Sequence, residues 1–159
     1  MNDPLYALEP VYEILIERTE DVDFVNSVIH HPEIENLASD EGPRFQAVRH
    51  PYIYYLVPRI EKPLGVMMFL PVNSITWNPH IALFQEFRGK GLGTGAIREA
   101  IRWMFKNTPC RKLIAFPPQF NLGMYNVFTK VGFKREGFSP KSVMKDGHIY
   151  GRYILGLEK

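Results

Sequence analysis

A glycine-rich octapeptide constrains the fold of this chain more than any other feature. Residues 88–95 read Arg-Gly-Lys-Gly-Leu-Gly-Thr-Gly, between an apolar strand pattern and an amphipathic helix pattern. Glycine at alternate positions lets backbone N–H groups approach a ligand closely and point the same way. The helix that follows adds the positive end of its dipole at the same place. With Arg88, Lys90 and the Thr94 hydroxyl nearby, the segment predicts a pyrophosphate site; the alternative is a tight turn where glycine only avoids a clash.

Two other phosphate-binding motifs do not fit this segment. Residues 91–96 match the G-x-G-x-x-A form of the dinucleotide fingerprint, but that motif needs an acidic residue at the end of the next strand. Here the next strand ends in Phe-Pro-Pro-Gln at 116–119, without a carboxylate. A nucleotide P-loop ends in Gly-Lys-Ser/Thr, whereas Lys90 is followed by Gly91. Both motifs are therefore excluded.

The periodicity of apolar residues predicts a mixed α/β domain in the order β-α-α-β-β-β-α-β-α-β-β. Thr19 is expected to cap the first helix and Asn121 the last, with Gly132 as a left-handed C-cap. Asn78-Pro79 is expected to interrupt the third strand of an antiparallel meander. The expected strands cover 11–16, 52–57, 64–72, 75–84 and 112–116, and the expected helices cover 19–29, 32–37, 93–106 and 121–132. A final hairpin is expected from 133 to 157, with its turn at 146–147.

Length and charge narrow the class of protein. The 159 residues suit one domain spanning the whole chain. Residues 1–80 carry a net charge of −7 and residues 81–159 a net charge of +9, so an anionic ligand is expected on the second half. Cys110 is the sole cysteine, and the five histidines are scattered, so no metal site is implied. No stretch looks like a signal peptide or a membrane span, and we expect a cytoplasmic protein.

Two motifs together resemble the GNAT superfamily of N-acetyltransferases. The family pattern Arg/Gln-x-x-Gly-x-Gly/Ala is matched by Arg88, Gly91 and Gly93. A second family block is matched by Asn121 and, eleven positions later, Gly132-Phe133. The resemblance covers nearly the whole chain and implies the GNAT fold, a mixed, mostly antiparallel sheet with helices on both faces. It also implies acetyl-coenzyme A as cosubstrate and direct acetyl transfer to an amine, without an acetyl-enzyme on Cys110.

The resemblance assigns cofactor contacts to named residues. Its pyrophosphate would be held by the backbone of Arg88, Gly89, Lys90, Gly91, Leu92, Gly93 and Thr94. Its pantetheine arm would pair with the strand that ends at Leu83 and Phe84, where that strand diverges from 112–116. Asn121 would hydrogen-bond the same arm, and Phe128 is placed with the residues that line it.

The reaction also needs a proton donor for the leaving sulfur and a base for the amine. Family members often place a leaving-group tyrosine seven positions after the motif asparagine, and this chain has Phe128 there. Tyr125, three residues earlier, is the substitute candidate; alternatively it is an ordinary aromatic, and the thiolate takes its proton from water. His80 is the candidate base, with a purely structural histidine as the alternative. Glu86 is the other acidic option, beside Arg88 and therefore expected in solvent.

The sequence leaves three functions open. The first is an N-acetyltransferase acting on a primary amine of a small molecule or protein. The second is a GNAT-fold binding or assembly protein with lost catalysis, for example in phage head assembly, and its partner would be a second copy or a phage structural protein. The third is a nucleic-acid-binding module, which the basic second half would suit, although its basic residues form no recognition motif. Four strand aromatics are assigned either to an acceptor pocket or to the core: Tyr52, Tyr54, Tyr55 and Trp77.

Overall fold

One seven-stranded sheet organises the chain, with helices on both faces. The computed structural model describes residues 13–35, 45–89 and 91–159. The strand order across the sheet is β1-β2-β3-β4-β5-β7-β6, and all neighbours are antiparallel except β4 and β5. The strands are β1 (Leu15–Thr19), β2 (Tyr54–Arg59), β3 (Gly65–Pro71), β4 (Thr76–Leu83), β5 (Lys112–Ala115), β6 (Lys134–Lys145) and β7 (His148–Glu158). The helices are α1 (Val22–Ile29), α2 (Pro32–Glu35), α3 (Leu92–Asn107) and α4 (Leu122–Lys130).

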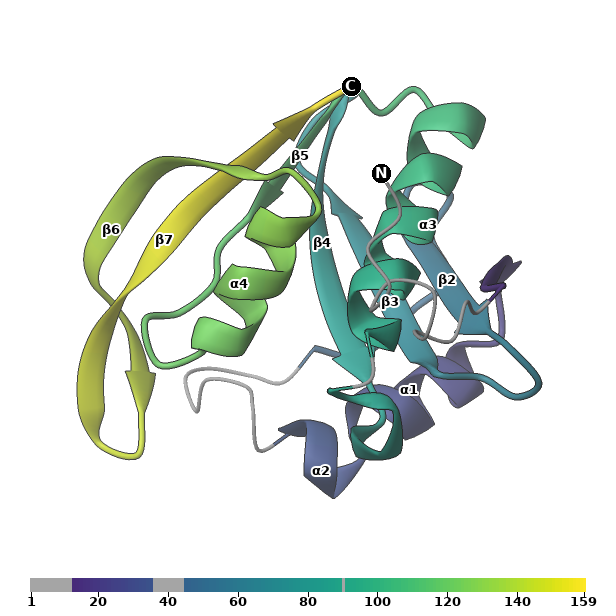
Figure 1. The fold of residues 1–159 in the computed structure, drawn as a ribbon, viewed down its shortest axis with the longest axis horizontal. Helices are drawn as coiled ribbons and strands as arrows, with labels where there is room; N and C mark the ends of the chain where they lie inside the picture. The colour runs from purple at the N-terminus through teal and green to yellow at the C-terminus, as the bar shows by residue number, and fades with distance from the viewer. Residues whose placement is uncertain (1–12, 36–44, 90) are drawn as a thin grey trace, which may run out of the picture.

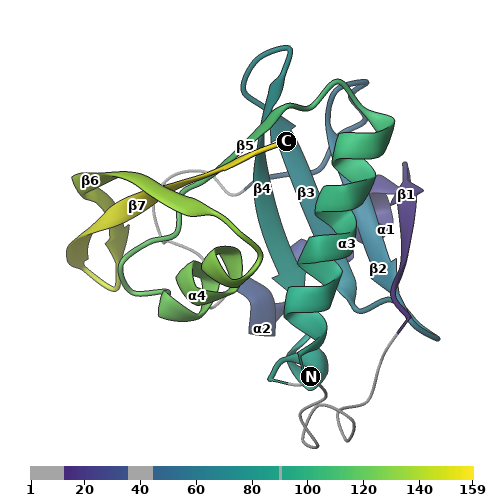
Figure 2. The same ribbon diagram turned by 45° about the horizontal axis from the view of Figure 1, so that its top comes forward.

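Alternate residues of the central strands face two separate cores. Leu56, Met67 and Trp77 point to the face covered by α3 and α4, where they pack with Ile97 and Phe128. The intervening residues of the same strands form a second cluster with α1 and α2: Tyr55, Val57, Val66, Met68 and Ala82 pack there with Val25, Val28 and Ile34. Figure 2 shows α3 in front of β2, β3 and β4, with α1 behind them. The predicted fold class and element order are confirmed.

Three local predictions need correction or fall partly outside the described residues. The N-cap of α1 is Asp21, whose side chain accepts a hydrogen bond from the N–H of Phe24, and not Thr19. The Thr19 hydroxyl accepts the N–H of Asp21 instead, so it fixes the residue before the helix. The first strand lies at Leu15–Thr19, later than expected. Positions 11, 12, 36 and 37, included in the predicted elements, lie outside the described residues.

The predicted break at Asn78-Pro79 is wrong, because β4 runs without interruption from Thr76 to Leu83. Proline is tolerated in a strand where its missing N–H faces no partner. Pro79 pairs with Phe69 of β3 on one side, whereas β5 pairs only with Thr76 and Trp77 on the other. The nitrogen of Pro79 therefore faces the side of β4 that has already lost its neighbour.

Candidate active site

The sheet opens where β4 and β5 separate. Their parallel pairing ends after two residues, although β4 continues for six more. Beyond Ala115 the chain follows β7 instead: the N–H of Tyr153 donates to the carbonyl of Pro117 (2.9 Å), and that of Gln119 donates to the carbonyl of Gly151 (3.0 Å). In Figure 1, β4 and β5 start together near the C-terminus and then move apart, with α4 beside the opening. The predicted divergence of these two strands is present.

The edge of β4 that faces this opening carries backbone groups without a strand partner. The carbonyl of Thr76 accepts from Val72 and the N–H of Phe84 donates to Leu64, so even-numbered residues bond toward β3. The carbonyl of Ile75 accepts from Lys112, so odd-numbered residues bond toward β5. By this alternation the backbone groups of Ile81 and the N–H of Leu83 face the opening. An extended ligand could add here as a further strand.

The last carbonyl of this edge is already occupied. Arg88 donates to the carbonyl oxygen of Leu83 from both Nε (3.1 Å) and Nη2 (2.9 Å). The intervening residues 85–87 form one 3-10 turn that brings Arg88 back onto the strand. The usable edge therefore ends at the N–H of Leu83. Phe84 was predicted as part of this edge, but its N–H donates to the carbonyl of Leu64, on the β3 side. Its contact with a cofactor stays a prediction.

Two glycines of the loop shape an open N-terminus for α3. Gly89 and Gly91 both have φ +74°, and a Cβ added at either would meet nothing within 4 Å. Gly91 is the N-cap of α3 and provides no side chain to cap it. The first hydrogen bond of the helix runs from the N–H of Gly95 to the carbonyl of Gly91 (3.2 Å). The N–H groups of Leu92, Gly93 and Thr94 come before it and have no acceptor within the helix. This geometry fits an anion such as a pyrophosphate. Lys90 lies outside the described residues.

The other two glycines have the packing role that was the alternative interpretation of this segment. A Cβ at Gly93 would lie 3.4 Å from Cδ2 of Leu83, and one at Gly95 would lie 2.9 Å from Cδ1 of Ile14. These residues let α3 approach the end of β4 and the segment before β1. The spacing of the four glycines therefore combines two requirements, left-handed turns and close helix packing.

Asn121 caps α4 as predicted. Its Oδ1 accepts the N–H of Met124 (3.1 Å), and its amide nitrogen lies 4.0 Å from Sδ of the same methionine. Gly132 follows the C-cap Val131 with φ +110°, one position beyond the residue that closes the helix. A contact of the Asn121 amide with a cofactor stays a prediction.

Phe128 and Tyr125 differ in their surroundings. Phe128 is 0% exposed and its ring lies 4.8 Å from that of Phe133, centroid to centroid, so the structure gives it a packing role. Its predicted place beside the cofactor stays a prediction. Tyr125 is half-buried, with its ring 4.7 Å from Tyr153. Among the described residues no hydrogen bond is made by its hydroxyl, which leaves that group available to a ligand.

His80 lies in the middle of β4 and pairs with Met68 of β3. Its neighbours on the same face, Met68 and Ala82, belong to the cluster under α1 and α2. Burial lowers the pKa of His80 below its ordinary 6.5, so its imidazole is neutral at neutral pH and can accept a proton. Tyr125 packs against the other core, under α3 and α4. The candidate base and the candidate acid therefore belong to opposite faces of the sheet.

The remaining candidates have structural environments. Glu86 is exposed and pairs with Lys62 at 3.3 Å, as expected for a loop residue in solvent. Trp77 is buried and donates from Nε1 to the carbonyl of Tyr52 (2.8 Å). Tyr55 is buried too, and its hydroxyl donates to the carbonyl of Val48 (2.9 Å). These two aromatics belong to the core. Burial raises the pKa of the Cys110 thiol to about 11, which argues against a nucleophilic thiolate.

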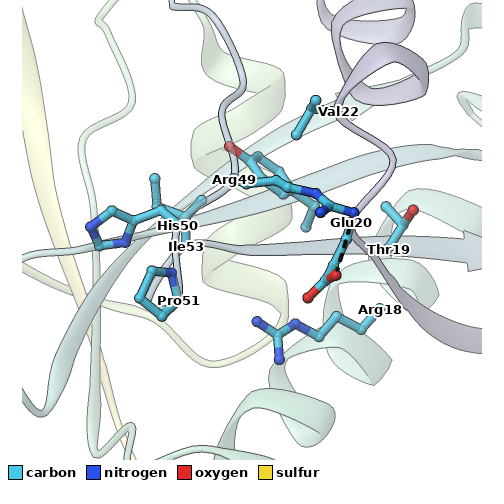
Figure 3. Close-up of a pocket in the computed structure, with 9 residues that line it drawn as sticks. Arg18, Thr19, Glu20, Val22, Arg49, His50, Pro51 and Ile53 are labelled. Carbon is cyan, nitrogen blue, oxygen red and sulfur yellow. Dashed lines mark ion pairs between the residues drawn. The ribbon is translucent and has the colours of Figure 1, made fainter.

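A separate pocket of about 230 Å³ lies at the β1 edge of the sheet (Figure 3). Its lining includes Arg18, His50 and the exposed pair of Glu20 with Arg49, whose charged atoms are 3.7 Å apart. None of the predicted site residues lines this pocket, apart from Tyr55, whose hydroxyl is already bonded to Val48. The helix that starts beside this pocket, α1, is capped by the side chain of Asp21, and the pocket does not lie between two separating strands. We therefore place the candidate active site at the β4–β5 opening.

Sequence comparison decides the family of the chain. The sequence model of the acetyltransferase (GNAT) family matches residues 9–133, which include β1 to α4, the glycine loop and the Asn121 cap. The chain belongs to the acetyltransferase (GNAT) family. This match confirms the predicted family. Among the described residues, no cluster of three or more His, Cys, Asp and Glu side chains could hold a metal ion.

Curated relatives match part of this GNAT chain. One is named "Putative phosphinothricin acetyltransferase YwnH", from Bacillus subtilis (strain 168), and is 34% identical over 88 residues, 55% of this chain and 53% of the relative. Another is the "SPbeta prophage-derived uncharacterized N-acetyltransferase YokL" of the same strain, 26% identical over 84 residues, 53% of this chain and 48% of the relative. The chain thus spans about half the length of these relatives.

A solved structure extends the fold comparison to nearly the whole GNAT chain. The spermidine N-acetyltransferase from Vibrio cholerae, in complex with CoA and spermine, superposes with a TM-score of 0.78. The alignment covers 91% of this chain and 95% of that one at 14% identity, which shows a shared fold. In the described parts of the chain, no helix has both the length and the apolar character needed to cross a membrane.

Proposed function

We propose that this chain transfers an acetyl group from acetyl-coenzyme A to a primary amine of a small molecule or protein. The observation that carries the proposal is the uncapped N-terminus of α3, turned by Gly89 and Gly91, next to the unpaired edge of β4. The first feature fits a pyrophosphate and the second fits the amides of a pantetheine arm. When bound, acetyl-coenzyme A would supply an activated thioester near the β4–β5 opening.

The charges of the two halves support an amine as the acceptor. The helices α1 and α2 carry Asp23, Glu33 and Glu35, and Asp21 caps the first of them. This acidic side favours a cationic amine, whereas the basic second half favours the anionic cosubstrate. An amine that enters the β4–β5 opening from this side would therefore approach the face of β4 that carries His80. The relative YwnH and the solved spermidine enzyme have names that point to amine acceptors as well.

His80 and Tyr125 have complementary tasks in this proposal. Neutral His80 accepts a proton from the ammonium group of the acceptor, and the free amine then attacks the carbonyl carbon of the thioester. The carbon–sulfur bond breaks, and the leaving sulfur takes a proton from the hydroxyl of Tyr125. The new amide nitrogen releases its extra proton to water, and the Tyr125 phenolate takes a proton back from water. Because Phe128 has no hydroxyl and is fully buried, Tyr125 is the tyrosine of α4 assigned to this step. Steady-state rates with a panel of polyamines, amino acids and peptides would test it; no transfer to any amine would refute it.

A second candidate function is a binding or assembly protein of the same fold. It is favoured by Phe128, which replaces the leaving-group tyrosine, and by the prophage origin stated in the name of YokL. It predicts coenzyme A binding without turnover, together with a stable complex with a second protein. Acetyl transfer to any amine at an enzymatic rate would remove this candidate.

A further inference from the structure

The last turn before the glycine loop is held by a residue far away in the sequence. Oε1 of Glu33 accepts the backbone N–H of Gln85 at 2.9 Å, across 52 positions. Glu33 lies in the single turn of α2, which is anchored by the buried side chain of Ile34. Gln85 begins the 3-10 turn that ends at Phe87, directly before Arg88. The contact therefore links α2, on the acidic side of the sheet, to the entrance of the candidate pyrophosphate loop.

Other contacts hold the same turn more weakly. The ring of His31 meets that of Phe84 edge-on, with centroids 5.9 Å apart. Lys62 pairs with Glu86 at 3.3 Å, but both side chains are more than half exposed, and such pairs contribute little. The bond from the N–H of Gln85 to Glu33 is charge-assisted, because its acceptor is a carboxylate, which makes it the stronger tie.

We infer that Glu33 is a positioning residue for the cosubstrate loop, an inference that rests on the proposed function. By fixing Gln85, the carboxylate sets the point where the chain leaves β4. It thereby sets the position of Arg88 and of Gly91, the N-cap after which the free N–H groups of α3 begin. Glu33 and Arg88 act on the two backbone groups that flank Phe84: the carbonyl of Leu83 and the N–H of Gln85. Loss of either tie frees the loop entrance while both cores stay intact.

The test compares three variants by coenzyme A titration, steady-state kinetics and backbone hydrogen exchange. Glu33→Ala removes the acceptor, whereas Glu33→Gln keeps an oxygen in the same place. Glu17→Ala removes an exposed carboxylate from β1, 62% exposed and far along the sheet from the loop, and serves as the matched control. We expect Glu33→Ala to weaken coenzyme A binding about tenfold and to raise the KM for acetyl-coenzyme A alike, with kcat within about twofold. Exchange at residues 84–89 should rise.

Partial rescue distinguishes positioning from general stabilisation. Glu33→Gln should regain affinity to within about threefold of the wild type, and Glu17→Ala should leave it unchanged. The inference is overturned if the wild type binds coenzyme A and Glu33→Ala binds it equally well, or if exchange at 84–89 does not change. A wild type that binds no coenzyme A refutes the proposed function instead, and the exchange measurement still decides whether Glu33 holds the loop.

Discussion

Arg88 reaches back over one 3-10 turn and places two guanidinium nitrogens, Nε at 3.1 Å and Nη2 at 2.9 Å, on the carbonyl oxygen of Leu83. The glycine-rich motif predicts that this residue contributes its charge to a pyrophosphate. In the structure it also closes the free edge of β4 and fixes the distance between that edge and the N-terminus of α3. One side chain thus couples the two surfaces that a coenzyme A molecule would contact.

The first prediction separates the charge of Arg88 from its geometry. Arg88→Lys keeps the positive charge, but one ammonium group cannot reproduce a contact from two nitrogens of a planar group. We expect the dissociation constant for coenzyme A to rise about tenfold, measured by isothermal titration. Arg102→Lys on the exposed surface of α3 is the control and should bind normally. Unchanged affinity in Arg88→Lys would show that charge alone matters.

The second prediction uses two glycines with nearly the same backbone conformation. Gly91 has φ +74° and Gly147, in the β6–β7 turn, has φ +76°, and a Cβ added at either position would meet no atom within 4 Å. Substitution by alanine should cost each variant about 1–2 kcal/mol of unfolding free energy through backbone strain. Only Gly91→Ala should lose affinity for coenzyme A, because its methyl group would lie beside the free N–H groups at the start of α3. Equal affinities in both variants would contradict the placement of the site.

The third prediction concerns His80 and the pH dependence of the rate. A base must be neutral to accept a proton, and burial holds the pKa of His80 below 6.5. The rate should therefore stay constant as the pH falls to about 6.5 and then decline through the lowered pKa. His80→Gln should lower kcat about 100-fold or more and abolish that decline. His148→Gln, at an exposed position of β7, should change neither.

The fourth prediction follows from the same pKa shift and needs no substrate. Since the folded pKa of His80 lies below the unfolded value, the unfolded chain binds more protons between the two. Above pH 6.5 His80 should not lower the free energy of unfolding. As the pH falls toward the folded pKa, it should lower that free energy by an increasing amount. Denaturant unfolding of wild type and His80→Gln from about pH 7.5 to about pH 5 measures it. The prediction fails if the difference between the two proteins is independent of pH.

The fifth prediction addresses the proton donor on α4. Tyr125→Phe should lower kcat about tenfold or more at an unchanged KM, because only the hydroxyl is lost. Phe128→Tyr should not restore activity in that variant. It places a hydroxyl at a position that is 0% exposed, at a cost of about 1–3 kcal/mol of unfolding free energy. Full activity of Tyr125→Phe would mean that the thiolate leaves without help from this residue.

Local sequence signals predicted the helices and strands, the start of the helix capped by Asn121, and the turn of the last hairpin. The helix pattern, the Asn121 cap and the Asp146-Gly147 turn depend on neighbours within a few residues, and the structure agrees with each. The strand containing Pro79 was predicted less well, because proline breaks a strand only if its nitrogen faces a partner. Whether β5 is that partner depends on the path of the chain beyond Ala115, which no local pattern encodes.

Long-range contacts account for what the sequence could not indicate at the site. The closeness of Gly95 to Ile14 gives this glycine a reason that its spacing in the motif does not reveal. Glu33 meets Gln85 across 52 positions, and neither residue belongs to a recognisable pattern. Arg88 is identifiable from its motif, but its bond to Leu83 depends on the 3-10 turn between them. In each case the sequence shows the residue itself, but only the folded structure shows which residue it contacts.

Titration of coenzyme A into the wild-type chain tests the central claim most directly. The uncapped N-terminus of α3 after Gly91 and the free edge of β4 predict one site per chain with a dissociation constant in the micromolar range, about 1–100 µM. The affinity should fall in Gly91→Ala and stay unchanged in Gly147→Ala. No heat of binding at millimolar coenzyme A, or equal binding by both glycine variants, would contradict the account.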